Sequence, residues 1–288
     1  MAKKRKSKKR GSPRKNSPRR PAVPAADLKY VLYEECVQSP DWHVRHFPRY
    51  HRWMTGRDPK RLREDFCGTS RISAEWVRSA KDRTAVGLDL DPEPLAYFAR
   101  VHAPKLSPGE RARVRLEQAN VLRPTREKFD LIAACNFSFF VFKERETLVN
   151  YFRAARASLA PKGTLFLEMA GGEGMQEWLQ EERMVRVPGV GRVRYVWDQM
   201  DYDAISAVND YAIHFQLPSK RWLKHAFEYH WRLWGIREVR EALREAGFRD
   251  TKVFWEVADS RGRGTGEYAP MENADPAHAW IAYVAGVR

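Results

Sequence analysis

Short apolar runs alternate with amphipathic stretches along the first half of the chain. Strand-like runs lie at residues 62–66, 85–90, 113–118, 129–135 and 163–169. Apolar residues with helical spacing fill the segments between them at 70–80, 93–102 and 144–159. Strands that alternate with helices form a parallel sheet whose two faces the helices cover. The pattern therefore predicts an α/β fold.

Different patterns flank this region. Helical spacing at 30–37 and 46–54 predicts a helical cap, which we place at residues 27–60. After Gly171 and Gly172, polar and apolar residues alternate with period two at 192–202, 206–216 and 221–231. This alternation predicts an antiparallel β-meander within residues 190–234.

The end of the chain returns to the first pattern, with a helix at 236–246 and strands at 251–257 and 279–287. The sequence thus predicts one domain over residues 27–288. We expect a Rossmann-like, mostly parallel seven-stranded sheet with helices on both faces and the meander inserted after the fifth strand. The glycines at 262, 264 and 266 indicate a flexible loop near the site.

The positive charge is concentrated at the N-terminus. The net charge is +15, and residues 1–20 hold eleven Lys or Arg and no acid, which leaves +4 for the rest of the chain. Like-charge repulsion without apolar surface predicts a disordered arm over residues 1–26. Such an arm is suited to nucleic-acid binding or nuclear import, or it serves only solubility.

The three cysteines, Cys36, Cys67 and Cys135, lie far apart and lack the spacing of a disulfide framework or a metal site. We expect no bound metal and a reducing compartment, the cytoplasm or, in a eukaryote, the nucleus. The sequence shows no apolar signal region after the basic arm and no stretch long enough to span a membrane. A soluble protein is expected.

Two predicted strand ends carry residues suited to a nucleoside. Glu64-Asp65-Phe66-Cys67-Gly68-Thr69-Ser70 leaves the first strand, and Val86-Gly87-Leu88-Asp89 ends the second. Asp89 lies 21 residues beyond Gly68, near the ~20-residue spacing at which a ribose-binding acid follows a glycine-rich turn. A dehydrogenase would need Gly-x-Gly-x-x-Gly, but Phe66 and Ser70 replace two of these glycines. Glu64 and Asp65 would also repel a pyrophosphate.

From Tyr30 to Val287 the chain resembles the class I S-adenosylmethionine-dependent methyltransferases. Leu62-Arg63-Glu64-Asp65-Phe66-Cys67-Gly68-Thr69-Ser70 resembles the first motif of that superfamily, and Gly87-Leu88-Asp89-Leu90-Asp91 resembles its second. The chain is also similar to a group of bacterial methyltransferase-like proteins that carry Leu-Arg-Glu-Asp-Phe-Cys-Gly-Thr after a Tyr-x-x-Tyr-Glu helix. The resemblance implies S-adenosyl-L-methionine as cofactor and methyl transfer as the reaction.

The resemblance places the cofactor on residues from five parts of the chain. Glu64 or Asp65 would bind the ammonium of its amino-acid tail, and Asp89 both ribose hydroxyls. Asn120 would accept from the adenine amino group while Val121 donates its backbone N–H, although Asn120 is equally suited to a turn. Asn136 and Phe137 would lie beside the sulfonium. The full set is Tyr30, Glu64, Asp65, Cys67, Gly68, Thr69, Ser70, Asp89, Leu90, Asn120, Val121, Asn136 and Phe137.

Candidates for the acceptor side lie on the cap and the meander. Tyr33, His214 and Tyr229 are candidate catalytic residues, the last two as general bases, and Trp231 and Arg232 are candidate substrate-binding residues. Aromatic residues in a meander also pack sheets, so this set competes with a structural interpretation.

Two acceptor classes fit the sequence. The near-neutral body favours transfer to a nitrogen or oxygen of a small molecule, and Arg232 suggests an anionic one. The alternative is an RNA or ribosome-associated methyltransferase that the basic arm recruits. A non-catalytic binding module is the third interpretation, should Phe66 block the cofactor pocket.

Overall fold

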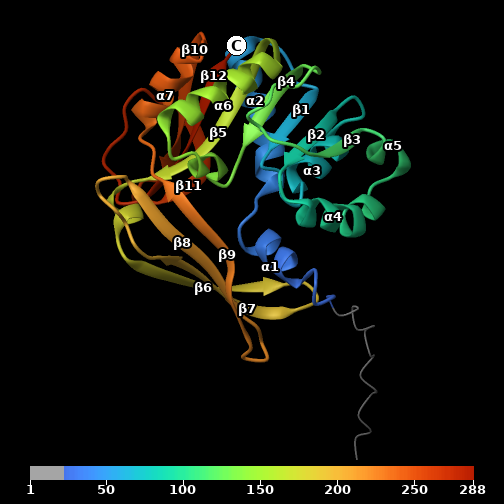
Figure 1. Cartoon of the computed structure of the whole chain (residues 1–288), viewed down its shortest axis with the longest axis vertical. Coiled ribbons are helices and arrows are strands. Elements are labelled where there is room, and N and C mark those ends of the chain that lie inside the picture. Colours follow the sequence, from blue (N-terminus) through green and yellow to red (C-terminus); the bar gives the residue numbers. More distant parts are fainter. Residues whose placement is uncertain (1–22) are drawn as a thin grey trace, which may run out of the picture.

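A central sheet of eight strands carries the fold (Figure 1). The computed structural model describes residues 23–288, so the predicted arm lies outside the described residues except for 23–26. The strands are ordered β11-β10-β12-β5-β4-β1-β2-β3. Their bounds are β1 (Arg61–Asp65), β2 (Thr84–Asp89), β3 (Val114–Gln118), β4 (Phe129–Ala134), β5 (Leu159–Gly171), β10 (Asp250–Ala258), β11 (Gly264–Pro270) and β12 (Trp280–Val287).

The strands from β5 to β3 pair in parallel, whereas β12 runs antiparallel to both β5 and β10. From β1 the chain moves outward through β2 and β3 and then crosses back to β4 on the other side of β1. Open α/β sheets bind ligands where the strand order reverses in this way, beyond the carboxyl ends of the strands. The ends of β1 and β4 therefore mark the expected site.

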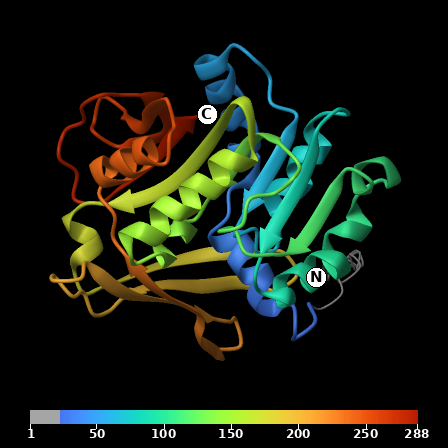
Figure 2. The same cartoon turned by 45° about the horizontal axis from the view of Figure 1, so that its top comes forward.

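Helices cover both faces of the sheet, as the hydrophobic pattern predicted (Figure 2). Leu131 and Ala133 of β4 pack with α2 (Pro40–Thr55), α3 (Arg71–Ser79) and α4 (Pro92–Val101). Ile132 and Ala134 face the other way, toward the core beneath α6 (Arg145–Ser158) and α7 (Ile236–Glu245). The shorter helices are α1 (Leu28–Cys36), α5 (Pro108–Arg111), η1 (Ala103–Lys105), η2 (Ser138–Val141) and η3 (Glu173–Gln176). Among residues 23–288, no helix combines the length and apolarity needed to cross a membrane.

A second, antiparallel sheet follows β5, which confirms the predicted insertion. It consists of β6 (Leu179–Val187), β7 (Gly191–Gln199), β8 (Val208–Gln216) and β9 (Trp222–Arg232), paired in chain order. In Figure 1 this sheet lies below the main sheet, beside α1. We refer to these four strands as the meander.

Two edge strands were missed. The meander was predicted with three strands, but β6 precedes them, and most of its side chains are exposed. The glycine-rich segment expected as a flexible loop contributes β11, which pairs antiparallel with β10 and extends the main sheet from seven strands to eight. Edge strands do not need two buried faces, so neither segment carries the apolar pattern that marks an inner strand.

Candidate functional site

The turn after β1 adopts a backbone that normally requires glycine. Phe66, Gly68 and Ser70 have φ angles of 55°, 49° and 55°, in the left-handed region. A Cβ atom added to Gly68 would meet nothing within 4 Å. The backbone at Gly68 is therefore open to a ligand.

Glu64 and Asp89 lie next to each other beneath this turn. The N–H of Gly68 donates to Asp89 Oδ2 at 2.7 Å, and the N–H of Asp91 donates to Asp89 Oδ1 at 2.9 Å. Glu64 accepts from the backbone N–H of Ser73 at 2.8 Å and from its hydroxyl at 2.5 Å. Burial raises the pKa of Glu64 to about 7, against the hydrogen bonds from Ser73 and with a smaller contribution from the charge of Asp89. Two carboxyl groups from neighbouring strands thus meet at the predicted nucleoside site.

Gly87 on β2 lets the turn lie this close to the sheet. A Cβ atom at Gly87 would collide with Ser70 Oγ and lie 2.9 Å from Cys67 Sγ. Cys67 is 2 % exposed, and its N–H donates to the carbonyl of Leu88 at 2.9 Å. Gly87 is thus part of the turn's support, although it lies on another strand.

Asp65 points to the other side of β1. Its carboxylate pairs with Arg63, with Nε and Oδ1 2.7 Å apart, and accepts from the hydroxyl of Tyr151 on α6 at 2.9 Å. Arg63 and Asp65 are both fully buried. Of the two acids proposed for the cofactor ammonium, the structure brings Glu64 to the site and engages Asp65 in a buried ion pair.

The predicted adenine residues follow β2 and β3. Asn120 Oδ1 accepts from the N–H of Leu122 at 2.9 Å, which is the turn role that the sequence left open. Val121 is buried, whereas the Leu90 side chain is 64 % exposed. Leu90 and Asn120 both line a hollow of about 760 Å³. An apolar residue this exposed beside Asp89 offers a surface on which an aromatic base can pack.

Helix α1 lies against the turn and against α4. The ring centroids of Tyr30 and Tyr97 are 5.0 Å apart, and the hydroxyl of Thr69 donates to Gln38 just beyond α1 at 3.4 Å. Glu34 is buried and contacts His102 Nε2 at 2.6 Å. Burial alone would raise the pKa of Glu34, but His102 and Arg71 lower it below its ordinary value. The cap is thereby fixed to the sheet domain by a buried ionic contact.

A cavity of about 840 Å³ lies between the carboxyl ends of the main sheet and the meander. Asn136 and Phe137, which follow β4 with φ angles of 53° and 58°, lie at its wall. Two of the predicted acceptor residues from the meander, Tyr229 and Trp231, also line it, as does Tyr33 of α1. Its other lining residues include Val37, Glu168, Glu181, Glu182, Arg183, Tyr195, Trp197, Ile213, Glu256 and Trp280. We refer to this space as the acceptor cavity.

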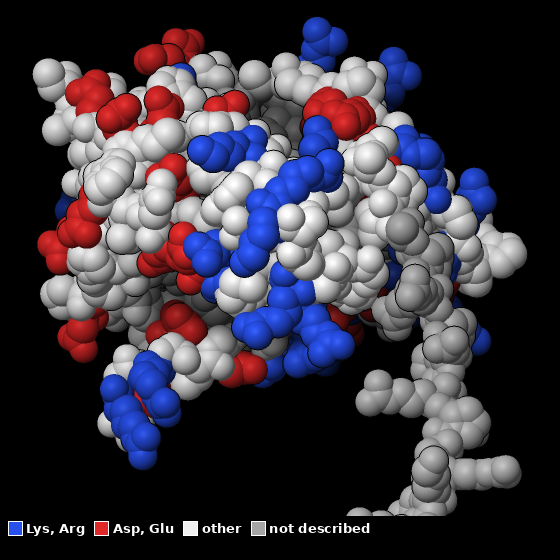
Figure 3. All heavy atoms as spheres, turned by 90° about the horizontal axis from the view of Figure 1, so that it is seen from below, with Lys and Arg blue, Asp and Glu red and all other residues white. Residues whose placement is uncertain are grey.

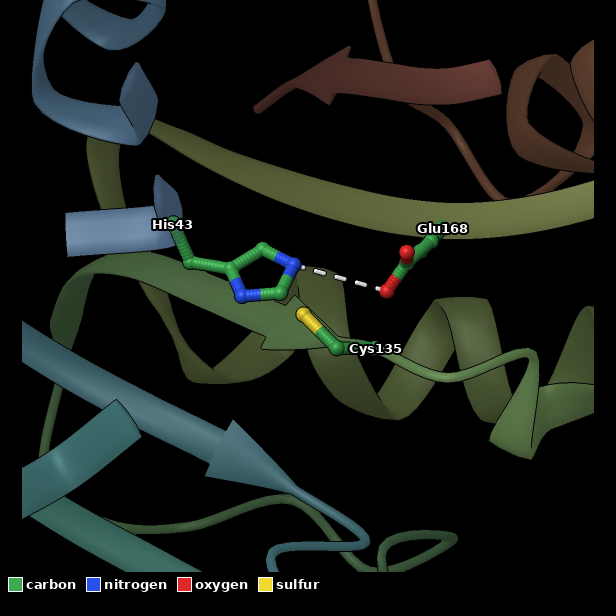
Figure 4. Close-up of side chains that lie close together, drawn as sticks. All are labelled: His43, Cys135 and Glu168. Carbon is green, nitrogen blue, oxygen red and sulfur yellow. Dashed lines mark ion pairs between the residues drawn. The ribbon is translucent and has the colours of Figure 1, made fainter. Parts of the chain in front are cut away.

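A buried cluster adjoins the acceptor cavity (Figure 4). His43 from α2, Cys135 after β4 and Glu168 from β5 place their donor atoms within 4.8 Å of one another. His43 Nε2 lies 3.5 Å from Glu168 Oε2, and the hydroxyl of Tyr283 donates to Glu168 Oε1 at 3.2 Å. The N–H of Asn136 donates to Glu168 Oε2 at 2.7 Å, so the cluster is joined to the wall of the cavity.

His214 and Arg232, predicted as a general base and a substrate-binding residue, are not among the residues that line the acceptor cavity. His214 Nε2 lies 3.1 Å from Asp198 Oδ2, and its Nδ1 accepts from the N–H of His225 at a β-bulge. The Arg232 guanidinium donates to the carbonyl of Lys143 at 2.8 Å and stacks over Trp234 at 3.7 Å. Side chains alternate between the two faces of a strand, so the neighbours of Ile213 and Trp231 lie on the opposite face of the meander.

Sequence reasoning missed Glu168, which is the buried acid of the acceptor cavity. It stands alone in the apolar run Leu165-Phe166-Leu167-Glu168-Met169. An isolated acid in an inner strand is costly to bury without a partner, and that is the signal that could have found it. Trp197 was missed as well, although it shares the alternation that identified Tyr229 and Trp231.

The outer surface differs in charge from the cavity. Figure 3 shows Lys and Arg side chains in a band across the face seen from below, with Asp and Glu at its margins. Exposed basic residues of the meander include Arg186, Arg192, Lys220, Arg221 and Lys224. In contrast, four glutamates and one arginine line the acceptor cavity.

Solved structures share this architecture over nearly the whole chain. DesVI of Streptomyces venezuelae superposes with a TM-score of 0.67 at 19% identity and covers 92% of this chain and 98% of its own. CalS10, a S-adenosylmethionine-bound amino pentose methyltransferase from Micromonospora echinaspora, gives 0.65 at 18% identity, with 90% and 96% covered. The sugar N-methyltransferase KedS8 from Streptoalloteichus sp gives 0.64 at 17% identity, with 96% and 99% covered.

No protein-family model matches the sequence, and no curated protein matches it. The identities of 17% to 19% are low, so the likeness is one of fold. The chain therefore has the fold of S-adenosylmethionine-dependent methyltransferases.

Proposed function

We propose that this protein is a S-adenosylmethionine-dependent methyltransferase that acts on a small molecule. The observation that carries the proposal is the arrangement around Gly68. The open backbone of Gly68 lies beside Asp89 at one end of the site. Asn136, which follows β4, lines the acceptor cavity at the other end. One ligand with a nucleoside and an amino-acid tail can reach both parts.

The donor groups fit this cofactor. Asp89 offers a fixed carboxylate for the two ribose hydroxyls, and Glu64 offers one for the ammonium of the amino-acid tail. Leu90 and the hollow that it lines with Asn120 would take the adenine ring. A pyrophosphate would instead meet two carboxyl groups, which disfavours a dinucleotide.

The residues of the acceptor cavity hold and shield the reacting groups. When bound, S-adenosylmethionine supplies an electrophilic methyl group, which leaves the sulfonium for a nucleophilic nitrogen or oxygen while the electron pair stays on sulfur. Asn136 and Phe137 are suited to position the reacting groups, and Tyr33 and Tyr229 to orient the acceptor. Positioning and exclusion of water account for much of such a reaction, so no catalytic triad is required.

The neighbouring structures support a small acceptor. One is described as an amino pentose methyltransferase and another as a sugar N-methyltransferase. The acceptor cavity, at about 840 Å³, lies within the range of small-molecule pockets. The RNA alternative rests on residues 1–20, outside the described residues, and the carboxylates of the cavity do not support it. The three cysteines are free and buried, in keeping with the cytoplasm as the compartment.

The test is calorimetry with S-adenosylmethionine on the wild type, on Asp89→Ala and on Asp82→Ala. We expect binding to the wild type and a loss of about 10- to 100-fold in Asp89→Ala, since hydrogen bonds to a charged group contribute ~1.5–3 kcal/mol. Asp82 pairs with Lys60 at the opposite end of the sheet, so its removal should leave the affinity unchanged. No binding to the wild type, or equal affinities in all three proteins, would refute the proposal.

A further inference from the structure

Glu168 places a fixed negative charge at the acceptor cavity. It is 8 % exposed and is held by the N–H of Asn136, the hydroxyl of Tyr283 and the imidazole of His43. Burial would raise its pKa, but these three contacts outweigh burial and lower it. Within residues 23–288, its one ion-pair partner is His43. The side of the carboxylate that faces the cavity is therefore suited to a cation.

Aromatic rings line the cavity around this carboxylate. Tyr229 and Trp231 stack with centroids 4.2 Å apart, and Trp197 lies 6.2 Å from Tyr229 and 6.3 Å from Trp231. Tyr33 lines the same cavity, and burial, with a smaller contribution from the charge of Glu168, raises its pKa to about 12. The faces of Trp and Tyr attract cations. The aromatic rings and the Glu168 carboxylate thus both favour a cationic ligand.

The other charged residues of the cavity lining also favour a cationic ligand. Glu181, Glu182 and Glu256 join Glu168 in the lining, and Arg183 is the basic residue among them. Glu182 also pairs with Arg194 of β7, with Oε2 and Nη1 3.2 Å apart. The Arg183 guanidinium donates to the carbonyl of Cys36 and lies 4.7 Å from the ring centroid of Tyr195. An anionic acceptor would face an excess of carboxylates. The suggestion of an anion rested on Arg232, which points elsewhere.

On the basis of the proposed function, we propose that the acceptor is an amine that binds as its ammonium, with an N–H donated to Glu168 and its body against Tyr229 and Trp231. Asn136 connects this carboxylate to the turn where the cofactor sulfonium is expected, so an amine on Glu168 lies beside the reacting group. Before transfer the bound ammonium loses one proton to water, which frees the nitrogen lone pair to attack the methyl carbon while the carbon–sulfur electron pair stays on sulfur. The methylated amine is again an ammonium, so the same carboxylate can hold acceptor and product.

A metal ion is the competing use of Glu168, because His43 and Cys135 place donor atoms within 4.8 Å of it. Ligation of a metal by Cys135 would require its thiolate form. Burial, together with the charges of Glu168 and Glu64, raises the pKa of Cys135 well above its ordinary value, which favours the thiol.

The test compares three probes of similar size on the full chain saturated with S-adenosylhomocysteine. They are benzylamine, which is cationic at neutral pH, benzyl alcohol, which is neutral, and phenylacetate, which is anionic. Calorimetry should show benzylamine binding at least tenfold tighter than benzyl alcohol, with phenylacetate the weakest, since a charge-assisted hydrogen bond is lost in the other two. Glu168→Gln should abolish the preference. Glu228→Gln, the same change at an exposed position of β9, should retain it.

Several outcomes would overturn the inference. These are equal affinities for benzylamine and benzyl alcohol, no benzylamine binding up to about 10 mM, tighter phenylacetate binding, or a preference that survives in Glu168→Gln. The comparison of probes on the wild type stands even if that variant does not fold. One equivalent of Zn²⁺ retained by the wild type and lost in Cys135→Ser would assign Glu168 to a metal instead. If S-adenosylhomocysteine does not bind, both proposals fail; if it binds without a preference for benzylamine, only the amine fails.

Discussion

Cofactor binding should tighten as the pH rises from 5.5 to 7, and Glu64 is the reason. Burial raises the pKa of this carboxyl to about 7. An ammonium is stabilised only by the ionised form, so at lower pH a proton must leave before the amino-acid tail can bind. The same shift makes the free protein less stable as the pH rises from about 4.5 to 7, because the folded state then holds a proton that the unfolded state has lost.

The size of the effect follows from the ionised fraction. With a pKa of about 7, about 3% of Glu64 is ionised at pH 5.5 and about half at pH 7, so the dissociation constant should fall by about 16-fold, or ~1.6 kcal/mol. The amino group of the cofactor has an ordinary pKa near ~8 and stays largely protonated over this range. The predicted pH dependence of the dissociation constant therefore arises from Glu64 and not from the cofactor.

Calorimetry with S-adenosylmethionine at four pH values measures this slope, and two buffers with different ionisation enthalpies count the protons released. About one proton should be released at pH 5.5 and about half a proton at pH 7. Glu64→Gln should bind weakly with no slope, whereas Glu75→Gln, which alters an acid of α3 paired with Arg78, should keep it. A constant affinity in the wild type, or the same slope in Glu64→Gln, would refute the reasoning. The proton count needs only the wild type.

Three further predictions concern the supports of the site. Asp65→Asn should lower the free energy of unfolding, measured in urea, by ~3–5 kcal/mol, because it leaves the buried Arg63 without a counter-ion. The same change at the exposed Asp58 should lower it by under about 1 kcal/mol. Equal losses in the two variants would contradict the buried ion pair of Asp65. Gly87→Ala should lower the free energy of unfolding by ~1–3 kcal/mol and weaken cofactor binding, since the added Cβ would collide with Ser70. Gly109→Ala is the control, because a Cβ atom at Gly109 would meet nothing within 4 Å. The lowered pKa of Glu34 adds stability above its ordinary pKa that is lost as the pH falls below it. Melting temperatures from pH 6 to 3 should therefore fall more steeply in the wild type than in Glu34→Gln, and parallel curves would contradict this.

The main sheet could be predicted from sequence because its inner strands are buried on both faces. β4 and the second half of β5 are largely apolar and buried, and a helix with period 3.6 separates the two strands. β6 and β11 could not be predicted in this way, because most of their side chains are exposed and these strands are held mainly by pairing with one neighbour. Pairing is a long-range property that no local window of sequence records.

The two halves of the candidate site differ in how far apart their residues lie in the sequence. The nucleoside half lies within a few residues of two strand ends, so a local motif identifies it. The acceptor half brings Glu168 of β5 against His43 of α2 and Tyr283 of β12, which are far apart in the sequence. Neither His214 nor Arg232 lines the acceptor cavity, and strict alternation already separates Arg232 from Trp231.

The turn after β1 shows why counting glycines underestimates such a site. Phe66 and Ser70 hold left-handed backbone conformations that cost ~1–3 kcal/mol each without glycine. Phe66 packs against Phe142 and Tyr151, with ring centroids 5.8 Å away in both cases, and the hydroxyl of Ser70 lies over Gly87 within reach of Glu64. These contacts offset the strain and leave Gly68, the one glycine of the turn, open toward a ligand. The left-handed backbone that glycine adopts through its conformational freedom is maintained at Phe66 and Ser70 by tertiary packing.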